Sequence, residues 1–138
     1  MKQVVIDASV IASWFLPDEA DENHEDILNN MTKIKIHVPS IFEHEMMNIL
    51  LNAQRAKRLQ ASTSIEILET ISRYPISIEP STAVLMDHIN VFEMARAYHL
   101  TAYDAAYLEL ALRLNAPLIT NDKPLLEAAK ILKLKTTI

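Results

Sequence analysis

The sequence has 138 residues and a formal net charge of −5, and half of its residues are hydrophobic, which is typical of one globular domain with a single core. Because it contains no cysteine and no glycine, disulfides, thiolate metal sites, the P-loop, the dinucleotide-binding glycine fingerprint and the G-x-S-x-G nucleophile elbow are all excluded. The acidic balance argues weakly against a nucleic-acid-binding protein.

Short β-branched apolar runs alternate with longer runs of helical periodicity along the whole chain. In chain order, the predicted elements are a strand at 3–6, helices at 8–16 and 21–31, a strand at 36–38, helices at 40–57 and 62–73, a strand at 76–78, helices at 81–99 and 101–115, a strand at 118–120, a helix at 124–132 and a strand at 135–137. Nothing in the composition divides the chain, so we expect a single domain over residues 1–138.

Several element boundaries have specific signals. Pro17 ends the first helix, and Ser40 with Glu43 predicts a capping box at the start of the long helix. Asn115 is expected to stop its helix in the left-handed conformation, since glycine is absent. Strands separated by helices predict a central parallel sheet in a three-layer α/β/α sandwich, where ligands bind outside the carboxyl ends of the strands.

Four carboxylates fall at or near that predicted edge of the sheet. Asp7 ends the first strand with no basic neighbour in sequence, and Asp122 follows the strand at 118–120. Glu45 emerges from an apolar stripe of the long helix, and Asp104 lies in the first turn of the helix at 101–115. Buried carboxylates need a partner, because their desolvation is costly.

Each acid also has a structural interpretation. Asp104 with Thr101 resembles a capping box, Asp122 before a proline is a good N-cap, Asp7 can cap the following helix, and Glu45 can be an exposed helix residue. Together the four predict a site for a hard cation, because Mg²⁺ and Mn²⁺ prefer oxygen ligands and keep several waters. Such a site suits phosphoryl chemistry.

Three segments of the chain carry a resemblance to a known family. They are VVIDASVIASWFLPDE with Asp7, VPSIFEHEMMNIL with Glu45 and Asn48 in an E-x-x-N pattern, and LTAYDAAYLELALRLNAPLITND with Asp104 and Asp122. In these segments the chain resembles the PIN-domain ribonucleases, and most closely the VapC-type toxins of toxin–antitoxin pairs. It departs from them at His99–Leu100, where many relatives have glycine, and at Asn121, where small residues are common.

The resemblance implies a PIN-like fold and hydrolysis of RNA phosphodiester bonds that depends on Mg²⁺ or Mn²⁺. Asp7, Glu45, Asp104 and Asp122 would then be metal ligands, with Ser9, Asn48 and Thr120 as accessory residues. It also implies a homodimer and a cognate antitoxin that covers the acidic pocket.

The net charge is compatible with an RNA substrate, because the four acids account for most of it and bound divalent ions would offset them. Arg55, Lys57 and Arg58 form the basic cluster of the long helix. This cluster is either a solvated helix end that complements the dipole or a rail for RNA phosphates.

Other function classes are less well supported. A PIN-like module that binds a partner without cleaving remains an alternative, but all four acids are present. A haloacid-dehalogenase-type phosphatase would need a second Asp two residues after Asp7, where Ser9 stands. The five histidines lack the spacing of a zinc site. With no secretory signal and no membrane span, we expect a cytoplasmic protein.

Overall fold

The computed structural model describes residues 1–19, 23–80 and 82–138. Its elements are β1 (Lys2–Ile6), α1 (Ala8–Ser13), α2 (His24–Asn30), β2 (Ile34–Val38), α3 (Phe42–Arg55), α4 (Ala61–Ser72), β3 (Ile76–Ile78), a 3₁₀ helix (Leu85–His88), α5 (Ile89–Tyr98), α6 (Ala102–Leu114), β4 (Leu118–Ile119) and α7 (Lys123–Ile131). None of the helices in these ranges is long and apolar enough to cross a membrane.

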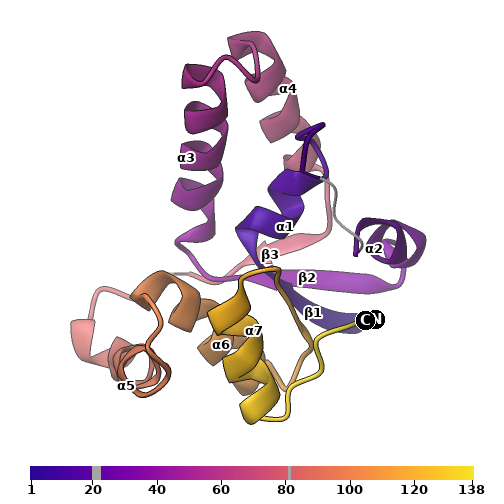
Figure 1. Ribbon diagram of the computed structural model, residues 1–138. Coiled ribbons are helices and arrows are strands. Elements are labelled where there is room, and N and C mark those ends of the chain that lie inside the picture. The colour runs from indigo at the N-terminus through magenta and orange to yellow at the C-terminus, as the bar shows by residue number, and fades with distance from the viewer. Residues whose placement is uncertain (20–22, 81) are drawn as a thin grey trace.

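The sheet has four strands in the order β3-β2-β1-β4, and every pair is parallel. Figure 1 shows α1, α3 and α4 on one side of the sheet and α5, α6 and α7 on the other, with the α3–α4 arm reaching away from it. The predicted three-layer α/β/α sandwich with a parallel sheet is therefore confirmed.

The core includes side chains of β1, β2 and β4. Val4, Val5 and Ile6 of β1 are fully buried, as are Ile36 of β2 and Leu118 of β4. A parallel strand covered by helices on both faces has no polar side, which is why the run before Asp7 is continuously apolar. Burial of each such side chain contributes about 1.5–3 kcal/mol and fixes where the strand ends point.

Several predicted local features are wrong. The helix expected at 8–16 ends at Ser13. The Ser40–Glu43 capping box does not form, because α3 begins at Phe42 and its N-cap residue, Ile41, makes no side-chain capping bond. The strand expected at 135–137 is absent from the described residues there. A backbone hydrogen bond from the Leu118 N–H to the Lys135 carbonyl at 2.9 Å joins this segment to β4.

The helix expected at 81–99 is also shorter than predicted. The Thr82 hydroxyl accepts from the Val84 N–H at 3.2 Å and donates to Asp87 at 2.8 Å, which gives the backbone a turn in place of a helix. A 3₁₀ helix follows, and α5 begins at Ile89. Residue 81, like residues 21 and 22 of the helix expected at 21–31, lies outside the described residues.

Left-handed backbone positions are filled without glycine. Asn115 ends α6 with a φ of 50°, as predicted, and His99 ends α5 with a φ of 54°. Lys57 and Lys133 also have positive φ, both at 61°. His99 stands where the resembled family often has glycine, and it adopts the conformation that glycine would favour.

Candidate active site

Asp7 lies at the carboxyl end of β1 and is only 4% exposed. Its backbone N–H donates to the Ile119 carbonyl at 3.0 Å, which ties this strand end to the end of β4. The Asp7 carboxylate accepts from the Ser9 N–H at 3.4 Å and from the Thr120 hydroxyl at 3.0 Å. Asp7 therefore caps α1, as its structural interpretation predicted, and it is held in one orientation at the edge of the sheet.

Thr120 connects Asp7 to Asp122. The buried Thr120 hydroxyl donates to Asp7 and accepts from the Asp122 N–H at 3.0 Å. Asp122 in turn is the N-cap of α7 and accepts from the Leu125 N–H at 3.0 Å. Hydrogen bonds from the Thr120 hydroxyl to Asp7 and from the Asp122 backbone N–H to Thr120 thus link these three residues at this edge of the sheet.

Glu45 and Asp104 reach the same region from two helices. Glu45 is half-buried on α3, and its Oε1 accepts from the Tyr107 hydroxyl of α6 at 2.7 Å. Asp104 lies in the first turn of α6, where its N–H donates to the Thr101 hydroxyl at 3.1 Å. Of the predicted capping box between Thr101 and Asp104, the bond to the Thr101 side chain is therefore present.

Tyr107 is a site residue that the sequence reasoning missed. Its side chain is fully buried, and burial raises the pKa of its hydroxyl far above the ordinary range, with the neighbouring Glu45 charge adding to the effect. The hydroxyl therefore stays protonated and donates to Glu45. The signal was its position three residues after Asp104, which puts both on one face of the helix.

Neighbouring negative charges help to raise the pKa of Asp7, Glu45 and Asp104. Burial raises the pKa of Asp7 most, and the charges of Asp104 and Asp122 add to it, while bonds from Thr120 and Ser9 oppose the rise. Burial also raises the pKa of Glu45, and the charges of Asp7 and Asp104 raise it further. The pKa of Asp104 is raised by burial and by the charge of Asp122. The four acids are close enough to share one electrostatic environment.

This environment holds concentrated negative charge without a protein cation. Among the described residues, no lysine or arginine forms an ion pair with any of the four carboxylates. No three of the acid or imidazole side chains in the described part of the chain lie close enough together to hold a metal ion between them. Hard oxygen donors spread over several elements fit an ion such as Mg²⁺, which keeps several waters and needs few protein ligands.

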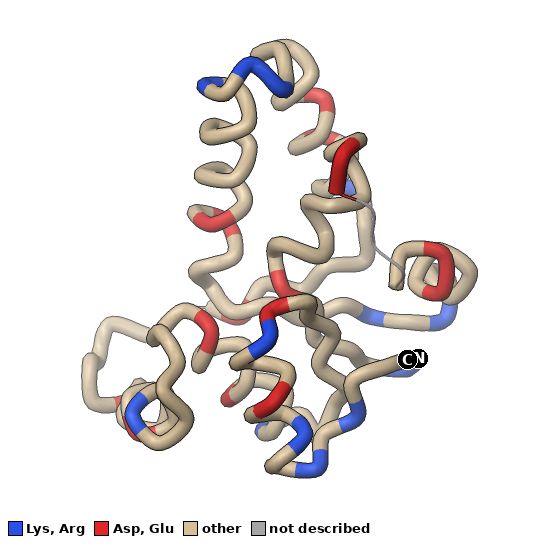
Figure 2. Tube along the Cα trace, viewed as in Figure 1, with Lys and Arg blue, Asp and Glu red and all other residues tan. Residues whose placement is uncertain are grey.

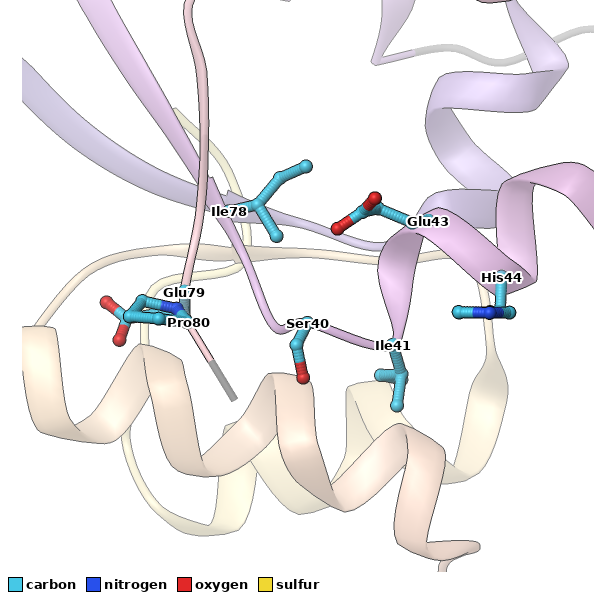
Figure 3. A pocket seen from close by; sticks show the side chains of 7 residues that line it. All are labelled: Ser40, Ile41, Glu43, His44, Ile78, Glu79 and Pro80. Atoms are coloured by element: carbon cyan, nitrogen blue, oxygen red, sulfur yellow. The ribbon is translucent and has the colours of Figure 1, made fainter. Parts of the chain in front are cut away.

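A cleft of about 590 Å³ opens beside Glu45. The exposed Ser9 and Asn48 line it, together with Asn52 and Tyr103. A neighbouring hollow of about 480 Å³ shares Ile41 and His44 with this cleft and lies at the ends of β2 and β3 (Figure 3). A substrate chain at the acids therefore has polar side chains to contact along the surface.

The basic cluster lies apart from the acids. Arg55, Lys57 and Arg58 are at the tip of the α3–α4 arm, where Figure 2 shows lysine and arginine gathered far from the sheet. Arg58 forms ion pairs with Asp18 and Glu19, so its charge joins the arm to the segment after α1. The structure does not bring these three residues to the site.

The raised pKa values predict that the site destabilises the metal-free protein as the pH rises. Between the ordinary values, 3.8 for Asp and 4.5 for Glu, and the raised ones, the folded state binds more protons than the unfolded state, so the free energy of unfolding falls. Urea denaturation in chelator from pH 4 to pH 7 measures this. Asp7→Asn should flatten the decline, and parallel curves for variant and parent would contradict the assignment.

The model of the PIN domain family matches residues 4–131 of the chain. Ribonuclease VapC3 of Pyrobaculum aerophilum is 28% identical over 127 residues, which cover 91% of this chain and 93% of that protein.

Two crystal structures show a similar fold. PAE2754 from Pyrobaculum aerophilum has a TM-score of 0.68 at 22% identity, covering 92% of this chain and 79% of that one. FitAcB from Neisseria gonorrhoeae has a TM-score of 0.61 at 15% identity, covering 98% of this chain and 96% of that one.

Proposed function

This chain belongs to the PIN domain family, and we propose that it is a divalent-metal-dependent endoribonuclease that acts as the toxin of a toxin–antitoxin pair. One observation carries the proposal most directly. Asp7 is buried at the edge of the sheet, with Asp104 and Asp122 raising its pKa and with no ion-pair partner among the described residues. A carboxylate kept in such surroundings indicates a cation that comes from solution.

Asp7, Glu45, Asp104 and Asp122 would hold Mg²⁺ or Mn²⁺, directly or through water. When bound, the ion supplies positive charge for the developing phosphorane and a water of lowered pKa. Thr120 orients Asp7 through its 3.0 Å bond, and Tyr107 orients Glu45. Ser9 and Asn48 line the cleft beside Glu45, where they can contact the RNA backbone.

The partners follow from the relatives. The curated relative is named Ribonuclease VapC3, which supports an RNA substrate and a cognate antitoxin for this chain. We propose a homodimer and a cytoplasmic location on the same family grounds. The presence of all four electrostatically linked acids favours the nuclease over a PIN-like module that only binds.

Removal of divalent metal is expected to stop RNA cleavage. The ion contributes several kcal/mol to transition-state stabilisation, so EDTA should lower the rate on the order of 10²-fold or more, and excess Mn²⁺ should restore it. The measurement uses protein freed of any bound partner and a fluorescently labelled folded RNA. Cleavage that persists at full rate in EDTA would show that the metal assignment is wrong, and no cleavage with either ion would leave the binding module as the better function.

A further inference from the structure

Lysines gather at the end of the sheet opposite the acids. Lys2 begins β1, Lys33 immediately precedes β2, Lys35 is the second residue of β2, and the others lie at or just after the end of α7. We call this group the lysine rim, and its members are Lys2, Lys33, Lys35, Lys130, Lys133 and Lys135. Figure 2 shows these basic segments around the two chain ends, away from the central acidic segments.

Backbone contacts hold the members of the rim together. The Lys2 N–H donates to the Lys33 carbonyl at 2.9 Å, and the Lys135 carbonyl accepts from Leu118 of β4 at 2.9 Å. Since β4 pairs with β1, the segment after α7 lies near the N-terminal end of β1, and Lys2 shares a cleft with Lys133 and Lys135. The rim is thus built from three separate parts of the chain that the fold places side by side.

Three of the lysines line one cleft of about 420 Å³. Lys2, Lys133 and Lys135 share its wall with neutral residues, among them Gln3 and Asn115, and no acid lines it. This cleft is separate from the one beside Glu45, because the two share no lining residue.

The charge of the rim is not neutralised within the described part of the chain. All six lysines are exposed, and the ion pairs found there involve arginines only. The rim holds six of the 13 basic side chains in a protein whose net charge is −5. Positive charge is therefore concentrated at one end of an otherwise acidic molecule, which favours a polyanion at that end.

We infer that the lysine rim binds backbone phosphates of a folded RNA substrate at a distance from the bond that is cut. The inference rests on the proposed ribonuclease function. β1 has five residues, so at about 3.3 Å per residue the acids and the rim lie on the order of 16 Å apart. A folded RNA spans that distance, whereas a dinucleotide bound at the acids is too short to reach the rim.

Lysine suits this role because its ammonium group attracts phosphate without a fixed geometry. Each phosphate contact releases counterions, so binding through the rim should depend strongly on salt and little on sequence. The rim would supply affinity that the acidic cleavage site lacks.

The test replaces Lys2, Lys133 and Lys135 by glutamine together and measures RNA binding by fluorescence anisotropy in EDTA. Affinity for a folded RNA should fall about tenfold at 50 mM salt, and the slope of log affinity against log salt should become shallower by about 2 to 3, which corresponds to the loss of three phosphate contacts. Affinity for a dinucleotide should fall by less than about twofold, because that ligand is too short to reach the rim from the acids.

A matched variant removes the same formal charge from the α3–α4 arm through Arg55→Gln, Lys57→Gln and Arg73→Gln. Its loss of affinity for the folded RNA should be clearly smaller. Equal losses in the two variants, an unchanged salt slope, or a loss confined to the binding of an acidic protein would overturn the inference. Binding is measured in EDTA, so its result does not depend on catalysis. If the wild-type protein cleaves no RNA, that outcome counts against the proposed function but not against RNA binding by the rim.

Discussion

Asp7→Asn is expected to abolish RNA cleavage and to raise the stability of the metal-free protein. Asparagine has the same shape, and its carbonyl oxygen can still accept from the Ser9 N–H or the Thr120 hydroxyl. It cannot supply negative charge to a metal, so loss on the order of 10³-fold in kcat/KM is expected. It also removes a buried charge that Asp104 and Asp122 disfavour, which is why the free energy of unfolding should increase.

Cleavage assays and urea denaturation in EDTA at pH 7 measure the two effects. Asp18→Asn is the matched control, because Asp18 is exposed and the bond from Arg58 lowers the pKa of its carboxyl. That substitution should leave cleavage intact and should not stabilise the protein. If Asp7→Asn retains cleavage within about tenfold of the parent, Asp7 is not a metal ligand.

This pairing of lost activity with gained stability would distinguish a functional acid from a structural one. A carboxylate that only caps α1 would cost stability when it is replaced, because a cap contributes about 1 kcal/mol. Asp7 does cap α1, but it does so from a buried position beside other acids. The structural and the functional interpretations of Asp7 are therefore compatible, and the sign of the stability change shows which effect is larger.

The sequence was sufficient to predict the layers of the fold and the positions of the acids along it. Strand periodicity and the apolar run before Asp7 placed that residue at the edge of a parallel sheet, and the same reasoning placed Asp122. Boundaries were harder to predict, because they depend on local hydrogen bonds. Thr82 forms a turn where the pattern indicated helix, and α3 begins without the expected cap.

The lysine rim and the role of Tyr107 could not be predicted in the same way. The rim is assembled from β1, the start of β2 and the residues after α7, which only the register of the sheet brings together. Tyr107 meets Glu45 across 62 positions in sequence. By contrast, Arg55, Lys57 and Arg58 form an obvious cluster in sequence and lie away from the site.

Tyr107→Phe is expected to weaken Mn²⁺ binding by about 10- to 100-fold, which is typical when a residue that orients a metal ligand is lost. The phenyl ring fills the same fully buried space, so packing around it is retained. The substitution removes the 2.7 Å bond to Glu45, which frees the carboxylate to rotate and leaves it to water, and it also removes the oxygen that accepts from the Ala8 backbone N–H. The loss should appear in kcat/KM at limiting Mn²⁺ and shrink as Mn²⁺ approaches saturation.

Titration of free Mn²⁺ by electron paramagnetic resonance measures the affinity without relying on catalysis. Tyr98→Phe is the control, because Tyr98 is a partly buried tyrosine that packs against the core from α5. If Tyr107 has only a packing role, both variants should bind Mn²⁺ as the parent does and differ at most in thermal stability. A weakened affinity confined to Tyr107→Phe would instead identify its hydroxyl as the group that positions Glu45, since the two substitutions remove the same atom from the same type of side chain.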